Sequence, residues 1–126
     1  MANLDQIMNH LADTAITEIG TSGFWTYIKY ANGVAVCWGE TTENNTITAW
    51  GNMYGRTLTA NTYPTGLFIE NPSHFSFANV DGGESVCGVG YVGTQTNTPR
   101  ITVLRPAALT GTKTFHKSYL ALGKWK

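Results

Sequence analysis

The sequence has little charge. Only 13% of its 126 residues are Asp, Glu, Lys or Arg, and eight basic residues balance eight acidic ones. A protein that binds nucleic acid needs a basic footprint, so we expect no nucleic-acid partner. Thr, Asn and Gly are abundant instead. Such a polar but uncharged surface is typical of secreted or virion β-proteins that bind neutral partners.

Long apolar runs are also missing. No run approaches the roughly 20 residues that a membrane-spanning helix needs, and the N-terminus lacks the pattern of a signal peptide. We therefore expect no membrane insertion and no export by the usual routes. The length suits one domain with a core of its own.

The residue types that carry catalysis and metal binding are few and scattered. No Ser lies in a G-x-S-x-G motif, and neither His nor Cys shows the paired spacing of a metal site; the histidines are His10, His74 and His116. Eight acidic residues make some pair suited to glycoside hydrolysis inevitable, and the candidates are Glu40, Glu70, Asp81 and Glu84. We expect no catalytic residue, no metal and no cofactor.

The two cysteines, Cys37 and Cys87, are a weak disulfide signal. Free Cys is commonly buried as a small apolar residue. We expect two reduced thiols in the core, with a disulfide as the open alternative.

Residues 88–93, Gly-Val-Gly-Tyr-Val-Gly, match the dinucleotide motif G-x-G-x-x-G. That motif works only where a helix N-terminus follows and holds the pyrophosphate. Here Thr-Gln-Thr-Asn-Thr-Pro follows, which cannot open a helix. We interpret the motif as a Gly-rich strand where a bulge or another backbone approaches closely.

The first residues differ from the rest. Four apolar residues recur at helical spacing and predict one stripe of a short helix: Leu4, Ile7, Met8 and Leu11. Two or three turns are marginal alone. The helix must pack on its own domain or on copies of itself as the end of a coiled coil.

From Phe24 onward the pattern is β. Asn32-Gly33 between two alternating runs is a strong hairpin signal. Taken as a two-residue turn, it pairs Ile28 with Cys37 and Tyr27 with Trp38. One face then holds Phe24, Thr26, Ile28, Tyr30, Ala35, Cys37 and Gly39, and is expected to be core. The other holds Trp25, Tyr27, Lys29, Val36, Trp38 and Glu40, and is expected to meet a partner.

Further strands are expected over 46–54, 67–69, around Phe75 and Phe77, and over 85–92, 101–104 and 119–125. Gly, Pro and Asn turns separate them. About eight short strands predict an all-β fold, an antiparallel β-sandwich or barrel, with a short N-terminal helix. We prefer the sandwich.

The strand over 46–54 carries a candidate ligand site. With Ile47, Ala49 and Met53 facing inward, the outward residues are Thr48, Trp50, Asn52, Tyr54 and Arg56. Aromatic rings flanked by amide and guanidinium donors suit sugars, whose C–H faces stack while their hydroxyls hydrogen-bond. A subunit interface uses the same residue types and is the equal alternative. The ligand-binding prediction is Trp50, Asn52, Tyr54 and Arg56.

Three stretches carry a family resemblance. They are Trp25-Thr26-Tyr27 followed by Gly33 and Cys37-Trp38-Gly39, the aliphatic strand of residues 100–106 that closes on Arg-Pro, and the ending Tyr-Leu-Ala-Leu-Gly-Lys-Trp-Lys of residues 119–126. In these stretches the chain resembles the C-terminal head domains of bacteriophage tail-fibre and baseplate receptor-binding proteins. The resemblance spans residues 20–126. It departs at Ile28 and Val36, where relatives often carry a basic and an acidic residue.

The resemblance implies a trimeric β-sandwich at a tail tip that adheres to host surface saccharide. It implies residues 1–19 as a helix and linker left from a stalk, residues 20–126 as the head, and other tail and baseplate proteins as partners. It also implies a place in the virion after assembly in the bacterial cytoplasm, where thiols stay reduced. It carries over no ligand residues.

We therefore expect a homotrimer with a subunit interface from the helical stripe and the aromatic hairpin face. The interface prediction is Leu4, Ile7, Met8, Leu11, Trp25, Tyr27 and Trp38. Two alternatives remain: a purely structural tail or baseplate module without ligand, and a small glycan-cleaving enzyme.

Overall fold

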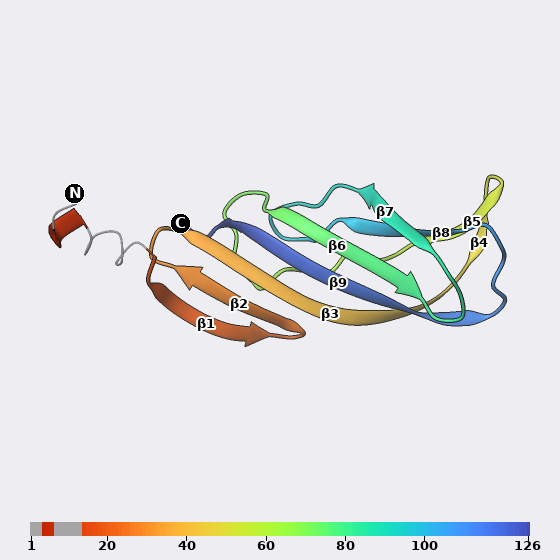
Figure 1. Ribbon diagram of the computed structural model, residues 1–126, viewed down its shortest axis with the longest axis horizontal. Coiled ribbons are helices and arrows are strands. Elements are labelled where there is room, and N and C mark those ends of the chain that lie inside the picture. Colours follow the sequence, from red (N-terminus) through yellow and green to blue (C-terminus); the bar gives the residue numbers. More distant parts are fainter. Residues whose placement is uncertain (1–3, 7–13) are drawn as a thin grey trace.

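The chain forms nine strands in the computed structural model, which describes residues 4–6 and 14–126. Residues 4–6 are helical, and the strands follow in chain order (Figure 1). Their bounds are β1 (Ile16–Ser22), β2 (Trp25–Tyr30), β3 (Val34–Thr46), β4 (Thr48–Trp50), β5 (Met53–Thr57), β6 (Ser73–Val80), β7 (Val86–Tyr91), β8 (Arg100–Arg105) and β9 (Thr112–Lys124). No helix of the described residues is long and apolar enough to cross a membrane.

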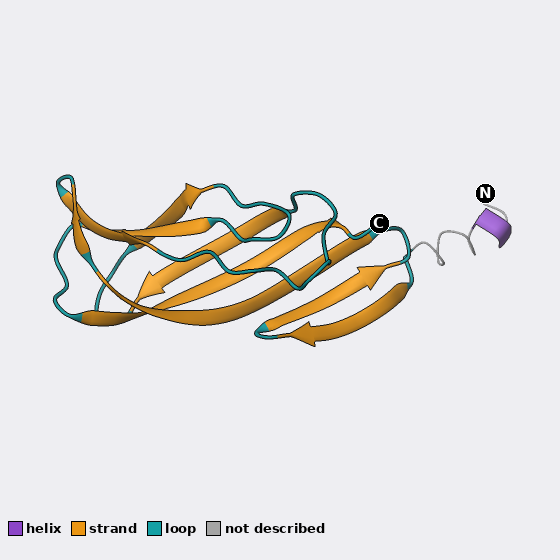
Figure 2. Cartoon of the chain, turned by 180° about the vertical axis from the view of Figure 1, so that it is seen from behind, coloured by secondary structure: helices purple, strands orange, loops and turns teal. Residues whose placement is uncertain are grey.

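The strands form two antiparallel sheets that pack face to face (Figure 2). The larger sheet has the order β1-β2-β3-β9-β6, and the smaller has the order β4-β5-β8-β7. Thirteen residues of β3 pair with thirteen of β9 along the middle of the larger sheet. The predicted all-β antiparallel sandwich is confirmed, with nine strands in place of about eight. β1 begins at Ile16, inside the stretch that the sequence assigned to the linker.

The β2–β3 hairpin lies where Asn32-Gly33 predicted it, but its register differs by one residue. Tyr27 pairs with Cys37, and Ile28 pairs with Val36. The loop holds three residues. The Gly33 amide donates to the Tyr30 carbonyl at 3.0 Å, and Gly33 itself has a φ of 93°. A turn followed by one left-handed residue is the usual three-residue hairpin loop, so the predicted two-residue turn is wrong.

This shift exchanges the two predicted faces of β2, while those of β3 stay as predicted, because neighbouring residues of a strand point to opposite sides. Trp25 and Tyr27 share the inner face with Cys37. Trp25 is buried, and its indole N–H donates to the Thr62 carbonyl at 2.8 Å. The prediction that Trp25 and Tyr27 lie on the outer, partner-facing side is wrong, whereas Trp38 is exposed as expected.

The strand predicted over 46–54 is interrupted by a tight turn. Trp50 pairs with Met53 across a loop of two residues, Gly51 and Asn52. Gly51 has a φ of 61°, and no described residue other than Gly has a positive φ. Gly at the first of two loop positions is the signature of a type II′ hairpin turn. The predicted alternation of inward and outward residues therefore breaks at this turn.

The core lies between the sheets in two adjoining clusters. One contains Trp25, Cys37, Tyr63, Phe68 and Tyr119, and the other centres on Phe115, which is fully buried. Several of the buried side chains come from the long connection after β5. Residues 67–69 belong to this connection and not to a strand, contrary to the sequence-based expectation.

One cation lies inside this core. The Lys117 ammonium donates to the Glu43 carboxylate at 3.1 Å, to the Thr59 carbonyl at 3.0 Å and to the Asn61 side-chain oxygen at 2.7 Å. The Tyr119 hydroxyl donates to the same Asn61 oxygen at 3.0 Å. All three protons of the ammonium thus have acceptors, which is the condition for burying a charge. The network ties the connection after β5 to the larger sheet.

Both cysteines are free, as expected. Cys37 is fully buried, and burial raises the pKa of its thiol to about 12. Cys87 is half-buried, and its sulfur accepts the Ala78 amide at 3.4 Å, between β7 and β6. These thiols serve as small core residues.

Candidate functional site

The outer face of the larger sheet carries an extensive exposed apolar surface. We call it the apolar sheet face. Its exposed members are Ile16, Ile19, Trp38, Phe75, Phe77, Leu120 and Leu122, and Ile28 and Val36 fill the space between them. The opposite side of the same sheet is the core.

Strand register places these side chains in rows across the sheet. In one row Ile28 lies between Ile19 and Val36, and Leu122 follows on β9. In the next row Trp38 lies beside Leu120, which in turn lies beside Phe75 on β6. Directly opposed residues of paired strands point to the same face. The surface is therefore continuous from β1 at one edge to β6 at the other.

A bulge in β1 extends this surface. Ile16 pairs with Tyr30 and Ile19 pairs with Ile28, and the register shifts between Ile16 and Glu18. Residues three apart would normally point to opposite sides of a strand. The extra residue, Thr17, brings Ile16 and Ile19 onto one face.

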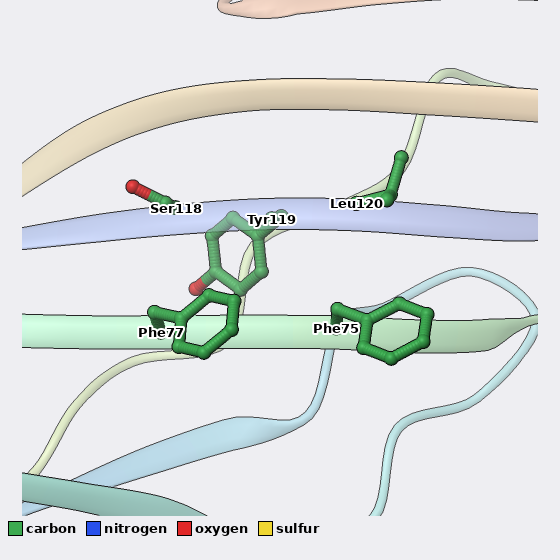
Figure 3. Close-up of a pocket in the computed structure, with 5 residues that line it drawn as sticks. All are labelled: Phe75, Phe77, Ser118, Tyr119 and Leu120. Atoms are coloured by element: carbon green, nitrogen blue, oxygen red, sulfur yellow. The ribbon is translucent and has the colours of Figure 1, made fainter.

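The end of the surface at β6 is hollowed. Phe75 and Phe77 point to the same side of β6, and Leu120 and Ser118 lie beside them on β9 (Figure 3). The depression has a volume of about 410 Å³, and the two rings are 63% and 62% exposed. At its margin the Ser118 hydroxyl donates to Glu40 at 3.4 Å. Such a hollow offers contact area and few hydrogen-bonding groups.

The extent of the surface is large for a monomer. Seven side chains that are 40–63% exposed leave roughly 550–700 Å² of apolar surface in water, taking about 150–250 Å² for each aromatic side chain and the lower end of that range for Ile and Leu. The largest apolar patch on a typical monomer is about 300–600 Å². A standard interface covers about 800 Å² on each partner. The apolar sheet face thus approaches the area that one partner contributes to a standard protein–protein interface.

The residues predicted as ligand contacts do not share one face. Tyr54 pairs with Arg105 and packs on the second core cluster. The Arg56 guanidinium donates to the Thr46 carbonyl at 2.6 Å and to the Thr46 hydroxyl at 2.7 Å. Trp50 and Asn52 remain exposed at the hairpin turn, where they line a shallow depression with Met53. The predicted alignment of all four outward is wrong, and only the turn residues are displayed.

The predicted interface residues are also divided. Trp38 belongs to the apolar sheet face, whereas Trp25 and Tyr27 face inward. Leu4 is 71% exposed. Ile7, Met8 and Leu11 lie outside the described residues.

Phe75 and Phe77 were assigned to a strand but to no functional site, although their spacing in the sequence is informative. They occupy alternate positions of β6, whose residues alternate between exposed and less exposed positions. That spacing indicated a strand with two inequivalent faces. It could not tell which face was outer, because Ala78 and Val80 on the opposite face are apolar as well.

The remaining motifs are structural. Residues 86–91, which include much of the Gly-rich motif, form the edge strand β7, and the register shifts between Val89 and Tyr91. A Cβ on Gly93 would lie 2.7 Å from the Asn97 carbonyl oxygen. The register shift and this close backbone confirm the interpretation of the motif as a Gly-rich strand with a bulge or close backbone approach. Within residues 4–6 and 14–126, no three His, Cys, Asp or Glu residues gather as a metal site.

The chain matches no family model and no curated protein sequence. Among solved structures it is similar to the N-truncated R1-type pyocin tail fibre. That match has 14% sequence identity and a TM-score of 0.47, and it covers 98% of each chain.

Proposed function

We propose that the chain is the head of a phage or prophage tail protein that works as a homotrimer and adheres to host surface saccharide. The apolar sheet face carries this proposal, since a surface of that extent needs a partner. A second copy of the chain is the occupant, and the family resemblance of residues 20–126 supplies the number three. The same resemblance supports a place in the virion tail, assembly in the host cytoplasm, and other tail and baseplate proteins as partners.

Assembly through the apolar sheet face is consistent with the distribution of charge. Along the row of Trp38, Leu120 and Phe75 no member is charged, so joining two copies there desolvates no ion. Glu40 lies at the margin, with the Ser118 hydroxyl as a hydrogen-bond donor. An apolar centre with a polar margin is the usual anatomy of an interface.

Light scattering coupled to gel filtration tests this assembly. The wild-type chain should have the mass of a trimer at micromolar concentration. The double variant Phe75→Ser/Phe77→Ser should be monomeric, because it removes two of the most exposed side chains of the surface. Val86→Ser is the matched control, since Val86 is 64% exposed on the smaller sheet, and its variant should remain trimeric.

A monomeric wild-type chain would contradict the proposal. So would a double variant that keeps the trimer mass. Far-ultraviolet circular dichroism separates loss of assembly from loss of fold, because both variants should keep the β spectrum.

A purely structural tail module is the second candidate. The inward positions of Tyr54 and Arg56 favour it. Of the four predicted ligand contacts, only Trp50 and Asn52 then remain exposed to a ligand. A glycan array distinguishes the two candidates, because only the receptor-binding head retains immobilised saccharide.

A further inference from the structure

A polar cleft lies on the inner side of the β1–β2 hairpin, away from the apolar sheet face. It has a volume of about 240 Å³. The β1–β2 hairpin forms one wall, and the connection after β5 forms the other. Its lining residues are Glu18, Thr21, Ser22, Tyr27, Lys29, Pro64, Thr65 and Leu67.

Strand register brings the functional groups of this cleft together. Glu18 pairs with Lys29, and Gly20 pairs with Tyr27. A Cβ at Gly20 would lie 2.5 Å from the Tyr27 hydroxyl oxygen and 2.6 Å from the adjoining ring carbon. The Tyr27 ring therefore crosses β1 over Gly20, and any larger residue there would displace it. The Glu18–Lys29 pair follows the same unbroken register as Gly20 and Tyr27, and the bulge begins only beyond it, between Ile16 and Glu18.

The charges in the cleft cancel. The Lys29 ammonium lies 3.5 Å from a Glu18 carboxylate oxygen. The pKa of Tyr27 is raised, chiefly because its hydrogen bond to Glu18 favours the protonated hydroxyl, and desolvation adds to the effect. The cleft thus offers a carboxylate acceptor, an ammonium donor and a phenol without net charge. Thr21, Ser22 and Thr65 add polar lining.

These groups match one ligand chemistry. A hydroxyl of a sugar both donates and accepts, so it can join Glu18 and Lys29, while a sugar C–H face packs on an aromatic ring. An anion or a cation would be opposed by one member of the ion pair. The volume lies below the roughly 300 Å³ at which pockets for drug-sized ligands begin, so the cleft suits a single ring.

We propose that this cleft binds one ring of a neutral saccharide. The inference rests on the proposed function for the source of that saccharide, the host surface. The cleft and the apolar sheet face lie on opposite sides of the same hairpin, because Tyr27 and Ile28 are neighbours in β2. A trimer closed through the apolar sheet face therefore leaves the hairpin's inner side uncovered by that contact.

Amide chemical shifts measured by NMR test the site directly. The wild-type chain is titrated separately with glucose, galactose and N-acetylglucosamine, and with glucuronate as the charged comparison. At least one neutral sugar should shift amides of residues 18–22, 27–29 and 65–67 together, and glucuronate should bind more weakly. Absence of these shifts with all three neutral sugars, or shifts confined to residues 50–53, would overturn the proposal.

Two matched variants give the second measurement. Tyr27→Phe keeps the ring but removes the hydroxyl, and should weaken sugar binding about tenfold, the effect of losing one good hydrogen bond. Tyr30→Phe makes the same change on the same strand outside the cleft, and should leave binding unchanged. Equal affinity of the two variants, with both melting as wild type, would also overturn the site.

Adsorption to host cells separates this proposal from the wider one. If the trimer adsorbs while the cleft binds no sugar, the cleft assignment is wrong and the receptor-binding function stands. If the trimer does not adsorb to any host or retain any glycan, the receptor-binding function itself fails. If the cleft binds free sugar but the chain adsorbs to no cell, sugar binding by the cleft stands. The host surface as the source of that sugar is then wrong.

Discussion

At the scale of single residues, Lys117 shows how this core accommodates a charge. Its ammonium is almost entirely buried, and its side chain is 3% exposed against 15% for Glu43. Glu43 also accepts the Thr59 amide and the Asn45 side-chain amide, each at 3.0 Å. The Glu43 carboxylate thus accepts hydrogen bonds from the Lys117 ammonium, from a loop backbone amide and from a residue two positions along its own strand.

Glu43→Gln should destabilise the domain strongly. The change leaves Lys117 buried without an opposing charge, and breaking a buried pair from one side typically costs about 3–5 kcal/mol. Glu40→Gln is the control, since Glu40 lies on the same strand but is exposed, and it should change stability by less than about 0.5 kcal/mol. Urea unfolding at one fixed protein concentration measures both. Similar midpoints for the two variants would contradict the role of Glu43.

The same carboxylate predicts a dependence on pH. Burial raises the pKa of Glu43, but hydrogen bonds from Asn45 and Thr59 and the contact with Lys117 outweigh it, so the folded-state pKa is lowered. A group with a lowered pKa stabilises the fold above its unfolded pKa, about 4.3, and loses that contribution as the pH falls through the folded value. The melting temperature should therefore drop below about pH 4.3. In Glu43→Gln this drop should be smaller.

At the scale of elements, the sequence predicted where strands meet better than how they pair. Asn32-Gly33 predicted the position of the β2–β3 turn correctly. The same two residues can form either a two-residue or a three-residue loop, so they do not determine the register. The choice depends on whether Asn32 takes a positive φ, and in the structure it does not. One residue of register then moved Trp25 from the surface to the core. Local chemistry therefore predicts a turn, while packing across both sheets selects its register.

Gly33 gives the element-scale prediction. Its φ of 93° disfavours any side chain, and a Cβ would also lie 3.1 Å from the Lys126 carbonyl oxygen. Gly33→Val should therefore destabilise the domain by about 1 kcal/mol or more. Asn32→Ala is the control in the same loop, since it removes only the Asn32 side-chain acceptor for the Val34 amide, and it should cost less. Unchanged melting of Gly33→Val would contradict the observed loop.

At the scale of the whole molecule, the fold class was predictable and the main surface was not. Alternating runs between Gly, Pro and Asn turns are sufficient to predict an antiparallel sandwich or barrel. The apolar sheet face needs five strands in register, and the order β1-β2-β3-β9-β6 joins residues that lie far apart in the chain. Leu120 meets Trp38 and Phe75 only through that order. Sequence periodicity contains no information about such neighbours.

The whole-molecule prediction follows from the proposed function, adsorption of a homotrimer to host cells, and substitution of Trp50 tests it. The side chain is 57% exposed at the tip of the β4–β5 hairpin, apart from the apolar sheet face. If Trp50 stacks on saccharide, Trp50→Ala should cost about 1–3 kcal/mol per site, and three linked sites multiply the loss through avidity. Adsorption should then disappear while trimer mass and melting temperature stay near wild type.

Two further variants serve as controls for the Trp50→Ala result. Ile69→Ala removes a similarly exposed apolar residue and should adsorb as wild type. Phe75→Ser/Phe77→Ser should lose adsorption together with the trimer, because monomers have no avidity. If Trp50→Ala instead breaks the trimer, Trp50 belongs to a subunit contact. If it adsorbs normally, Trp50 is not a receptor contact, and the polar cleft beneath the β1–β2 hairpin becomes the site that adsorption must depend on. Tyr27→Phe would then be the variant that loses cell binding while keeping its mass.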